Sequence, residues 1–421
     1  MISNAGDPLI WTISTLAVAG VIIRPFGIGE WIFAVVGAVI LVVAGLIPVA
    51  VAAHGIAAGF DVYLFLAGMM LLAEVARREG LFKYLATRAA KSARGSPRRL
   101  FALIYCVGTL VTVFLSNDAT AVVLTPAVAA IALAVEAPSP LPYLLICAFV
   151  ANAASFVLPI SNPANLVVFG DAMPPLVDWL VRFAVPAVLA IVATYGLLLW
   201  TQRKSLAGAV RSEVAEVELG RGGRIAAIGL VLAAVVLVLA SAFGFPLGWP
   251  TATAGLLTLT GVLIVERRSP LPMVRAISWD TLLLVAGLFV IVQALEFTGL
   301  KALLVAELEA AVRAAPDLSV LVIGVGTAFG TNLTNNLPLG LVGGGVLASA
   351  HVPDKVVDAV LIGIDLGPNL SVTGSLATIL WLVALRRENL TFGSLGFLKL
   401  GIVVMPPALL LALLARMFLP I

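Results

Sequence analysis

The sequence predicts an all-α integral membrane protein, with about ten transmembrane helices and two re-entrant hairpins arranged as two inverted repeats. Three observations predict this fold. The 421 residues are 62% hydrophobic and only 11% charged, whereas about a quarter of a soluble globular chain is charged. Long apolar segments follow one another along the whole chain, and polar breaks recur at matching places in its two halves.

Ten apolar segments are long enough to cross a membrane, which takes about 20 helical residues. They lie at 8–23, 31–53, 60–76, 141–170, 176–200, 225–243, 249–265, 279–296, 357–386 and 394–418. Two further stretches, 101–135 and 318–350, are too long for one span and are interrupted by Ser116-Asn117-Asp118 and Thr334-Asn335-Asn336. Non-helical backbone inside a bilayer needs protein or a water-filled cavity around it. Each stretch is therefore predicted to be a re-entrant hairpin with its tip inside the protein.

Positive charges predict the orientation. Segment 77–99 carries eight Lys and Arg residues and is expected in the cytoplasm. Tracing the ten spans and two hairpins from there puts 20 of the 25 basic residues inside and 5 outside, as the positive-inside rule requires. We therefore expect a multi-pass protein of the inner, cytoplasmic membrane, surrounded by lipid.

The two halves of the chain repeat each other. Segment 61–80 aligns with 280–299 at a shift of 219, and Leu115–Asp118 aligns with Leu333–Asn336 at a shift of 218. The basic segment after the first match has a counterpart, 300–317, with two basic and three acidic residues. These equivalent arms are expected on opposite faces of the membrane, so the repeats are inverted. Inverted repeats place the substrate site at their interface near the midplane.

The predicted organisation has three parts. Residues 1–200 form the first repeat, with spans over 8–76, the hairpin 101–135 and a broken helix at 141–170; 201–224 is a cytoplasmic linker; 225–421 is the second repeat, with the hairpin 318–350 and a broken helix at 357–386.

Four polar breaks are expected to converge where the halves pack together. They supply the candidate substrate-binding residues Ser116, Asn117, Asp118, Ser161, Asn162, Asn165, Thr334, Asn335, Asn336, Thr373, Gly374 and Ser375. Asn side chains both donate and accept hydrogen bonds, and helix N-termini offer free N–H groups. The set suits an uncharged solute with hydroxyl groups. The alternative is that these residues only cap broken helices.

Two acids, Asp118 and Asp365, are expected inside the membrane and are the candidates for proton coupling. An intramembrane carboxylate is costly and is a functional candidate by default, and protonation removes its charge. The alternatives are a helix cap for Asp118 and a solvated vestibule for Asp365. Asp61, Glu74 and Asp280 lie near helix ends and are expected to be structural.

Signals for an enzyme are weak. A four-ligand zinc site would need both Cys and both His residues of the chain, at unsuitable spacings. Neither the phosphate-binding G-x-x-x-x-G-K-[ST] sequence nor the nucleophile sequence G-x-S-x-G occurs. We expect no enzymatic activity, no cofactor and no nucleic-acid partner.

Three motifs resemble the ArsB-type arsenite efflux permeases. The motifs are Phe114-Leu115-Ser116-Asn117-Asp118 with Leu124-Thr125-Pro126, which resembles F-x-N-D with L-T-P; Asn335-Asn336-Leu337-Pro338, which resembles N-N-M-P; and Asp365-Leu366-Gly367-Pro368 with Gly374-Ser375-Leu376-Ala377-Thr378, which resembles D-L-G-P with G-S-L-A-T. The last match is long and specific, and the motif order holds over nearly the whole chain.

This resemblance implies the ion transporter superfamily fold and the export of arsenite or antimonite, as neutral trihydroxides, in exchange for protons. Some family members associate with a cytosolic ATPase subunit, the one protein partner that the resemblance suggests. The residues carried over by motif are Asn117, Asp118, Asn335, Asn336, Asp365, Gly374 and Ser375.

Two positions depart from the family pattern. The family often has an acid where Asn152 stands and a Lys where Asn369 stands, so one compensated acid–base pair would be missing here. The main alternative function, from the same superfamily, is a sodium-coupled anion carrier or a sodium/proton antiporter. A receptor or channel that does not transport by alternating access is disfavoured by the paired breaks.

Overall fold

The computed structural model describes residues 7–212 and 214–419, and within these ranges the chain is helical and has no β-strand. The helices of the first half are α1 Asp7–Ile23, α2 Glu30–Val43, α3 Val49–Ala58, α4 Phe60–Arg78, α5 Leu81–Ala93, α6 Pro97–Phe114, α7 Asn117–Ala119, α8 Thr125–Ala134, α9 Leu141–Ala153, α10 Pro163–Phe169 and α11 Leu176–Gln202. Those of the second half are α12 Arg221–Ala242, α13 Gly248–Glu266, α14 Leu271–Ala276, α15 Trp279–Phe297, α16 Leu300–Ala314, α17 Ser319–Thr334, α18 Asn336–Leu347, α19 Asp354–Leu366, α20 Leu376–Arg387 and α21 Ser394–Phe418.

Six of these helices, and the continuous helical segment Asn117–Ala134 that contains α7 and α8, are long and apolar enough to cross a membrane, and the bent pair of α3 and α4 would make an eighth span. Several shorter apolar helices accompany them, among them α1, α2, α9, α17 and α18. The predicted hairpins and broken helices account for most of the short ones. Both hairpins break at the predicted polar clusters, between α6 and α7 and between α17 and α18.

The predicted single span at 31–53 is wrong. Helix α2 ends at Val43 and α3 begins at Val49, because Gly45 adopts a left-handed φ of +69° and Pro48 caps α3. A left-handed glycine commonly ends a helix, and proline cannot continue one from its interior. Helix α3 then meets α4 at a bend of 46°.

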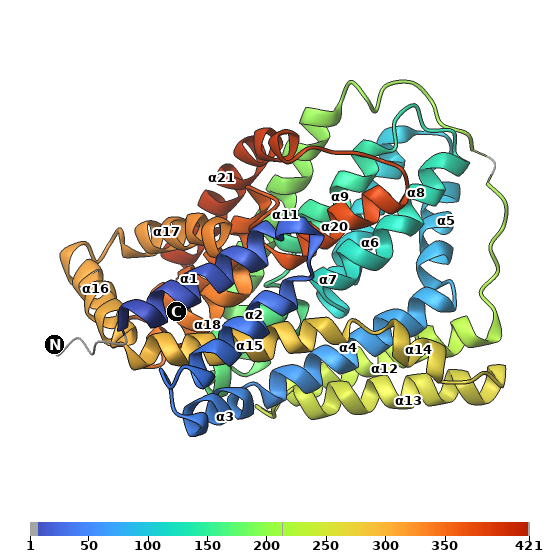
Figure 1. Ribbon diagram of the computed structural model, residues 1–421. Helices are drawn as coiled ribbons and strands as arrows, with labels where there is room; N and C mark the ends of the chain where they lie inside the picture. The colour runs from blue at the N-terminus through green and yellow to red at the C-terminus, as the bar shows by residue number, and fades with distance from the viewer. Residues whose placement is uncertain (1–6, 213, 420–421) are drawn as a thin grey trace.

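Helices α1–α4 and α12–α15 pack together, and we call them the scaffold group (Figure 1). Within it α4 lies against α13, and α15 lies against α2. A Cβ atom on Gly68 would lie 2.4 Å from the carbonyl carbon of Thr251, and one on Gly287 would lie 2.7 Å from that of Ala34. Glycine is therefore needed at both crossings, as is usual where membrane helices approach closely.

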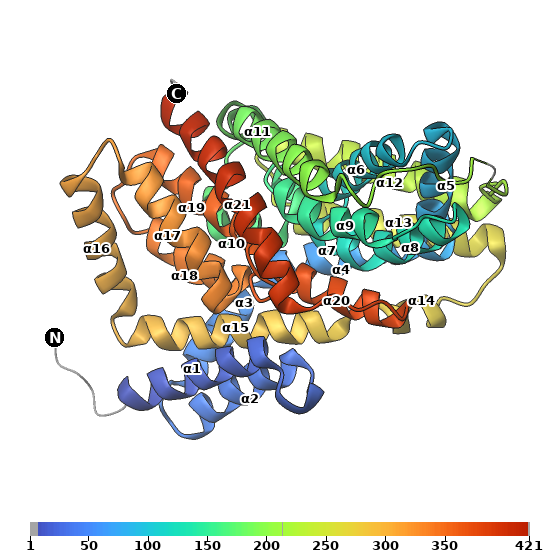
Figure 2. The ribbon, with the colours of Figure 1, turned by 90° about the horizontal axis from the view of Figure 1, so that it is seen from above.

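Helices α6–α11 and α17–α21 form a second body, the site group. In Figure 2 it lies beside α1, α2 and α15 and overlaps α4, α12 and α13 of the scaffold group. Its core is built on α9, which is buried on all sides from Pro142 to Ala153. The Trp381 indole donates to the carbonyl of Leu144 at 2.9 Å, and Phe149 stacks on Phe397 with 4.9 Å between ring centroids. A helix that is apolar all round belongs in such a core.

Two arms, α5 and α16, lie at opposite ends of the molecule (Figure 1). Each follows a left-handed glycine, Gly80 with φ +76° and Gly299 with φ +83°, which lets the chain turn sharply out of the preceding helix. This placement is the one expected for arms on opposite membrane faces. The exact division into repeats at 1–200 and 225–421 stays a prediction.

Candidate functional site

The first hairpin tip is closed by its own side chains. The Oγ atom of Ser116 accepts a hydrogen bond from the N–H of Ala119 at 3.2 Å, and Oδ1 of Asn117 accepts one from the N–H of Asp118 at 2.9 Å. A π-helical turn follows at Thr120–Leu124. These caps satisfy the first N–H groups of α7 locally, and they leave the amide nitrogen of Asn117 and the Asp118 carboxylate without a partner among the described residues.

The second tip is held by a different segment of the chain. Asn335, with φ +74°, donates from Nδ2 to the carbonyl of Thr373 at 3.2 Å. The backbone N–H of Asn336 donates to the carbonyl of Gly374 at 2.8 Å. The hydroxyl of Thr373 in turn donates to the carbonyl of Asn332 at 2.8 Å. The break in the second broken helix therefore holds this tip in place.

The first broken helix satisfies most of its own polar groups. Asn165 donates to the carbonyls of Ser155 and Leu158 at 2.9 and 3.3 Å, and the Ser161 hydroxyl donates to the carbonyl of Val113 at 3.0 Å. The hydroxyl of Ser161 and the amide nitrogen of Asn165 therefore bond within the protein, whereas Oδ1 of Asn165 is buried without a hydrogen-bond partner among the described residues.

Asn162 joins the two broken helices. Its Oδ1 atom caps α10 by accepting from the N–H of Ala164 at 3.0 Å, and its Nδ2 atom donates to Oδ1 of Asp365 at 2.7 Å. Asp365 is only 1% exposed, and its second carboxylate oxygen has no hydrogen-bond partner among the described residues. Asp365 is therefore buried behind Asn162.

A small cavity of about 30 Å³ lies where the two tips meet. Its polar lining comes from Asn117 and Asp118 of the first tip, Asn336 of the second, Asn162 of the broken helix and Thr281 of α15. This volume has room for about one or two water molecules. Four of the predicted residues thus lie together around this cavity. Thr334, Asn335, Thr373, Gly374 and Ser375 lie outside this lining, and the last three support the second tip and α20.

A larger cavity of about 120 Å³ continues from the small one. The two share Asp118 and Thr281, and the larger one extends past Ser116 to Glu74 and Arg77 near the end of α4. Because α4 leads directly into the basic arm α5, this cavity opens toward the face that the sequence predicts to be cytoplasmic.

Sequence reasoning missed the lining that the scaffold group contributes. Glu74, expected to be structural, does accept hydrogen bonds from Arg77 at 2.7 and 2.8 Å and from Arg78 at 2.5 Å, but it also lines the larger cavity. Thr281 lies in the first turn of α15, directly after Asp280. The one sequence feature that could have indicated this lining was Glu74 itself, an acid one helical turn before two arginines.

The two positions that depart from the resembled family touch each other. Nδ2 of Asn152 donates to Oδ1 of Asn369 at 3.0 Å, and Nδ2 of Asn369 donates to the carbonyl of Phe149 at 3.0 Å. The Ser375 hydroxyl donates to Oδ1 of Asn152 at 3.3 Å. A neutral amide pair therefore fills this buried position between the broken helices, outside the cavity lining.

The lining of the smaller cavity is polar and carries no basic group. It offers amides, one hydroxyl and one carboxyl group, and no Lys or Arg borders this cavity among the described residues. Nor do the described residues contain a group of three or more His, Cys, Asp and Glu side chains that would hold a metal ion.

Comparison with known proteins agrees with this architecture. The Arsenical pump membrane protein of Escherichia coli strain K12 is 29% identical over 434 residues, which cover 97% of each chain. The protein of the same name in Yersinia enterocolitica is 29% identical over 356 residues, 80% of this chain and 81% of its own. These relatives confirm the resemblance drawn from the motifs.

A solved structure shows the fold. The crystal structure of the YdaH transporter of Alcanivorax borkumensis covers 98% of both chains, with a TM-score of 0.56 and 16% sequence identity. The predicted all-α, ion transporter-like fold of a multi-pass membrane protein is therefore confirmed. The family model described as citrate transporter, CitMHS, matches residues 16–365. The chain belongs to the CitMHS family of membrane transporters.

Proposed function

We propose that this protein is a secondary active transporter that exports trivalent arsenite or antimonite, as the neutral trihydroxide, in exchange for protons. The observation that carries the proposal is the small cavity, whose polar lining is amides, one hydroxyl and one carboxyl group with no basic side chain. The arsenical pump names of two relatives that span most of the chain support the same class of cargo.

The free polar atoms of the cavity suit an uncharged hydroxyl compound. Nδ2 of Asn117 and the side-chain amide of Asn336 have no partner among the described residues, and both line the cavity. Hydroxyl groups of the cargo can accept from the first and exchange hydrogen bonds with the second. The cavity is too small for a trihydroxide as it stands, so cargo binding requires the two tips to separate or the larger cavity to contribute.

Asp118 is the proposed coupling group. Among the described residues it is the one carboxyl group that borders both cavities, and a carboxylate at this depth is costly unless it is protonated or paired. A proton taken up from outside would neutralise it, and proton release toward the cytoplasm would restore a charged acceptor for the next cargo molecule. Asp365, bonded to the cavity residue Asn162, is the second candidate.

A second candidate function is sodium-coupled carriage of an anion such as citrate. It is favoured by the description of the family model and by Arg77, which lines the larger cavity. The guanidinium of Arg77, however, donates two hydrogen bonds to Glu74. A tricarboxylate would need several free cationic donors, so the neutral cargo is the better fit.

Transport by everted membrane vesicles tests the proposal. Arsenite accumulation, measured by mass spectrometry, should depend on a proton gradient and be abolished by a protonophore. It should not depend on sodium and should not be inhibited by excess citrate. Accumulation that needs sodium and falls with citrate would instead establish the second candidate. The same assay with the purified protein reconstituted alone decides whether an ATPase subunit is required; we expect that it is not.

Resistance of cells gives an independent check. Expression should protect a sensitised strain from arsenite and antimonite but not from arsenate, because arsenate is an anion and no basic side chain borders the smaller cavity. Equal sensitivity of expressing and empty cells, with the protein present in the membrane, would contradict the proposal.

A further inference from the structure

The larger cavity of the site has a closed counterpart in the second half of the chain. At the shift of 219 that aligns the two halves, its lining residues Ala73 and Arg77 correspond to Val292 and Glu296 of α15. These two residues line a pocket of only about 10 Å³, which we call the outer pocket. It has room for at most about one water molecule, whereas the larger cavity measures about 120 Å³. Equivalent positions of the two halves therefore border an open space in one half and a closed one in the other.

The outer pocket lies where α15, the start of arm α16 and α18 meet. Lys301 of α16 and Val346 of α18 are among its other lining residues. Thr281 of α15 borders the larger cavity, and Glu296 lies about 22 Å further along the same helix. Because α15 leads directly into α16, the outer pocket lies toward the face that the sequence predicts to be outside. Helix α18 follows the second tip, so this pocket lies on the boundary between the scaffold group and the site group.

The side chain of Glu296 closes this boundary against α18. Nε2 of Gln293 donates to Oε2 of Glu296 at 3.1 Å and orients the carboxylate. A Cβ atom on Gly345 would lie 2.5 Å from Oε1 of Glu296, so this oxygen lies against α18 at a residue that has no side chain. At the equivalent position of the first half, at a shift of 218, stands Ala127. The carboxylate therefore reaches from one group to the other and occupies the space that the glycine leaves.

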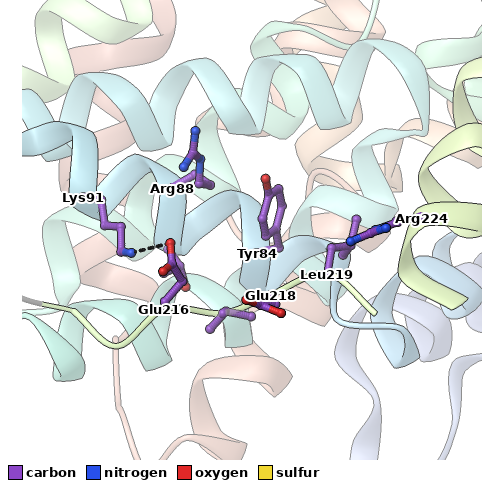
Figure 3. A pocket seen from close by; sticks show the side chains of 9 residues that line it. Tyr84, Arg88, Lys91, Glu216, Glu218, Leu219 and Arg224 are labelled. Atoms are coloured by element: carbon purple, nitrogen blue, oxygen red, sulfur yellow. Dashed lines mark hydrogen bonds and ion pairs between the residues drawn. The ribbon is translucent and has the colours of Figure 1, made fainter. Parts of the chain in front are cut away.

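The arm beside the outer pocket is weakly packed, in contrast to the cytoplasmic arm. No residue of α16 is buried, whereas seven residues of α5 are. Lys91 of α5 also forms an ion pair with Glu216 at 2.9 Å, which fastens this arm to the linker (Figure 3). Arm α16 lies at the edge of the molecule in Figure 2. Elements with few buried contacts open at the lowest free-energy cost. The outer pocket can therefore open by movement of α16 and α18 away from α15 while the linker keeps α5 in place.

We propose that Glu296 is the outer gate residue of the transport route, and that cargo leaves between α15 and α18 when the Glu296 carboxylate separates from Gly345. This inference rests on the proposed transport function. Inverted repeats expose a central site to the two sides of the membrane in turn. Since the larger cavity reaches the predicted cytoplasmic face and the outer pocket is closed, the molecule is in its cytoplasm-facing state. Movement of the site group against the scaffold group carries Gly345 away from Glu296 and joins the outer pocket to the small cavity at the tips.

Thiol labelling of the full-length protein in membranes tests the gate without any cargo. In a Cys106→Ser background, Val292→Cys reports on the outer pocket, and the remaining Cys147 is buried. With the gate residue intact, an impermeant thiol reagent added from outside should label this cysteine slowly. Glu296→Ala should raise the labelling rate at least about tenfold, because it removes the side chain that lies against α18. An unchanged rate in Glu296→Ala would overturn the proposal.

Two matched variants separate a gate from a general loosening of the outer side. Glu296→Gln should label within about twofold of the parent, because its amide oxygen can still accept from Gln293 and its side chain has the same length. Glu307→Ala, at an exposed acid of α16 outside the pocket lining, should also stay within about twofold. A rise in Glu307→Ala equal to that in Glu296→Ala would overturn the proposal.

The labelling result does not depend on which solute the protein carries. A tenfold rise in Glu296→Ala together with no arsenite transport by the parent protein would disprove the proposed cargo and support the gate. Arsenite transport by the parent protein together with an unchanged labelling rate would disprove the gate and leave the proposed function standing.

Discussion

The two hairpin tips have similar sequences but are stabilised by different hydrogen bonds. Leu115–Asp118 and Leu333–Asn336 both end a helix in a hydroxyl residue followed by polar side chains. The first tip caps itself through Ser116 and Asn117. The second tip has a cap of its own, in which Oδ1 of Asn335 accepts from the N–H of Leu337. It is in addition hydrogen-bonded to the break of the second broken helix, at the carbonyls of Thr373 and Gly374.

This difference suggests that the second tip is fixed in place, whereas the first tip carries the group that can gain and lose a proton. Each buried hydrogen bond contributes about 0.5–1.5 kcal/mol net, so the two bonds from Asn335 and Asn336 resist movement of the second tip relative to α20. The first tip carries the acid, Asp118, in contact with the larger cavity. A group that exchanges protons needs access to water, whereas amides that orient a cargo need to be fixed. We infer that the repeats have divided these two tasks.

The largest expected effect follows from removing the acid. Asp118→Asn keeps the size and the hydrogen-bonding capacity of the side chain but cannot titrate. It should reduce proton-driven arsenite accumulation in everted vesicles to the level of empty vesicles, while downhill arsenite exchange stays within about threefold, equivalent to less than about 0.7 kcal/mol.

Asp317→Asn, at an exposed position before α17, is the control and should transport normally. If Asp118→Asn still accumulates arsenite in a protonophore-sensitive way, Asp118 is not the coupling group, and Asp365→Asn becomes the variant to measure.

The comparison of the halves also predicts an all-or-none labelling result. In a Cys106→Ser background, Ser92→Cys on α5 and Ala310→Cys on α16 should react with an impermeant thiol reagent from opposite sides of the membrane. Both positions are exposed, and the remaining Cys147 is buried. Labelling of both from one side would refute the inversion of the repeats.

The sequence predicts the breaks that are polar and misses the break that is not. Asn, Ser and Thr clusters interrupt apolar runs, so hydropathy and turn chemistry predict all four polar breaks, three of which contribute to the lining of the small cavity. The break between α2 and α3 consists of apolar residues with one glycine and one proline. Residues 31–53 include no charged residue and no Asn, Gln, Ser or Thr, so the length of the apolar run was a poor guide there.

The cavity lining was only partly predictable, for a similar reason. Asn117, Asp118, Asn162 and Asn336 stand out as polar residues in membrane segments. Thr281 and Glu74 line the cavities because α15 and α4 pack against the tips, and that packing depends on distant contacts such as Gly68 against Thr251. Motif matching also could not show that the Ser161 hydroxyl and the Asn165 amide nitrogen donate to backbone carbonyls.

A moderate effect on stability is expected at the second tip. Asn335 has φ +74° and ψ 153°, a region that only glycine occupies without strain of about 1–3 kcal/mol. Asn335→Ala keeps this strain and removes the cap of the Leu337 N–H and the bond to Thr373. It should lower the free energy of unfolding by about 2 kcal/mol, measured as a lower thermal transition in detergent.

Asn335→Gly separates the two contributions, because it removes the strain together with the hydrogen bonds. It should be more stable than Asn335→Ala by about 1 kcal/mol. Equal stability of the two variants would mean that the backbone conformation of this residue costs nothing, and the contrast between a locally capped tip and a strained, tethered tip would fail.

The smallest effect is expected from Ser116→Ala, and it decides whether Ser116 binds cargo or only caps α7. Ser116 accepts from the Ala119 N–H at 3.2 Å, and Ser96, at the start of α6, accepts from the Arg99 N–H at 3.3 Å. Both caps are therefore worth about 1 kcal/mol, but only Ser116 borders a cavity. Ser116→Ala and Ser96→Ala should lower the thermal transition equally. If Ser116 only caps, the arsenite KM should rise by no more than about twofold in either variant, less than about 0.4 kcal/mol. A tenfold rise confined to Ser116→Ala would instead make its hydroxyl a direct ligand of the cargo and would extend the binding site from the small cavity into the larger one.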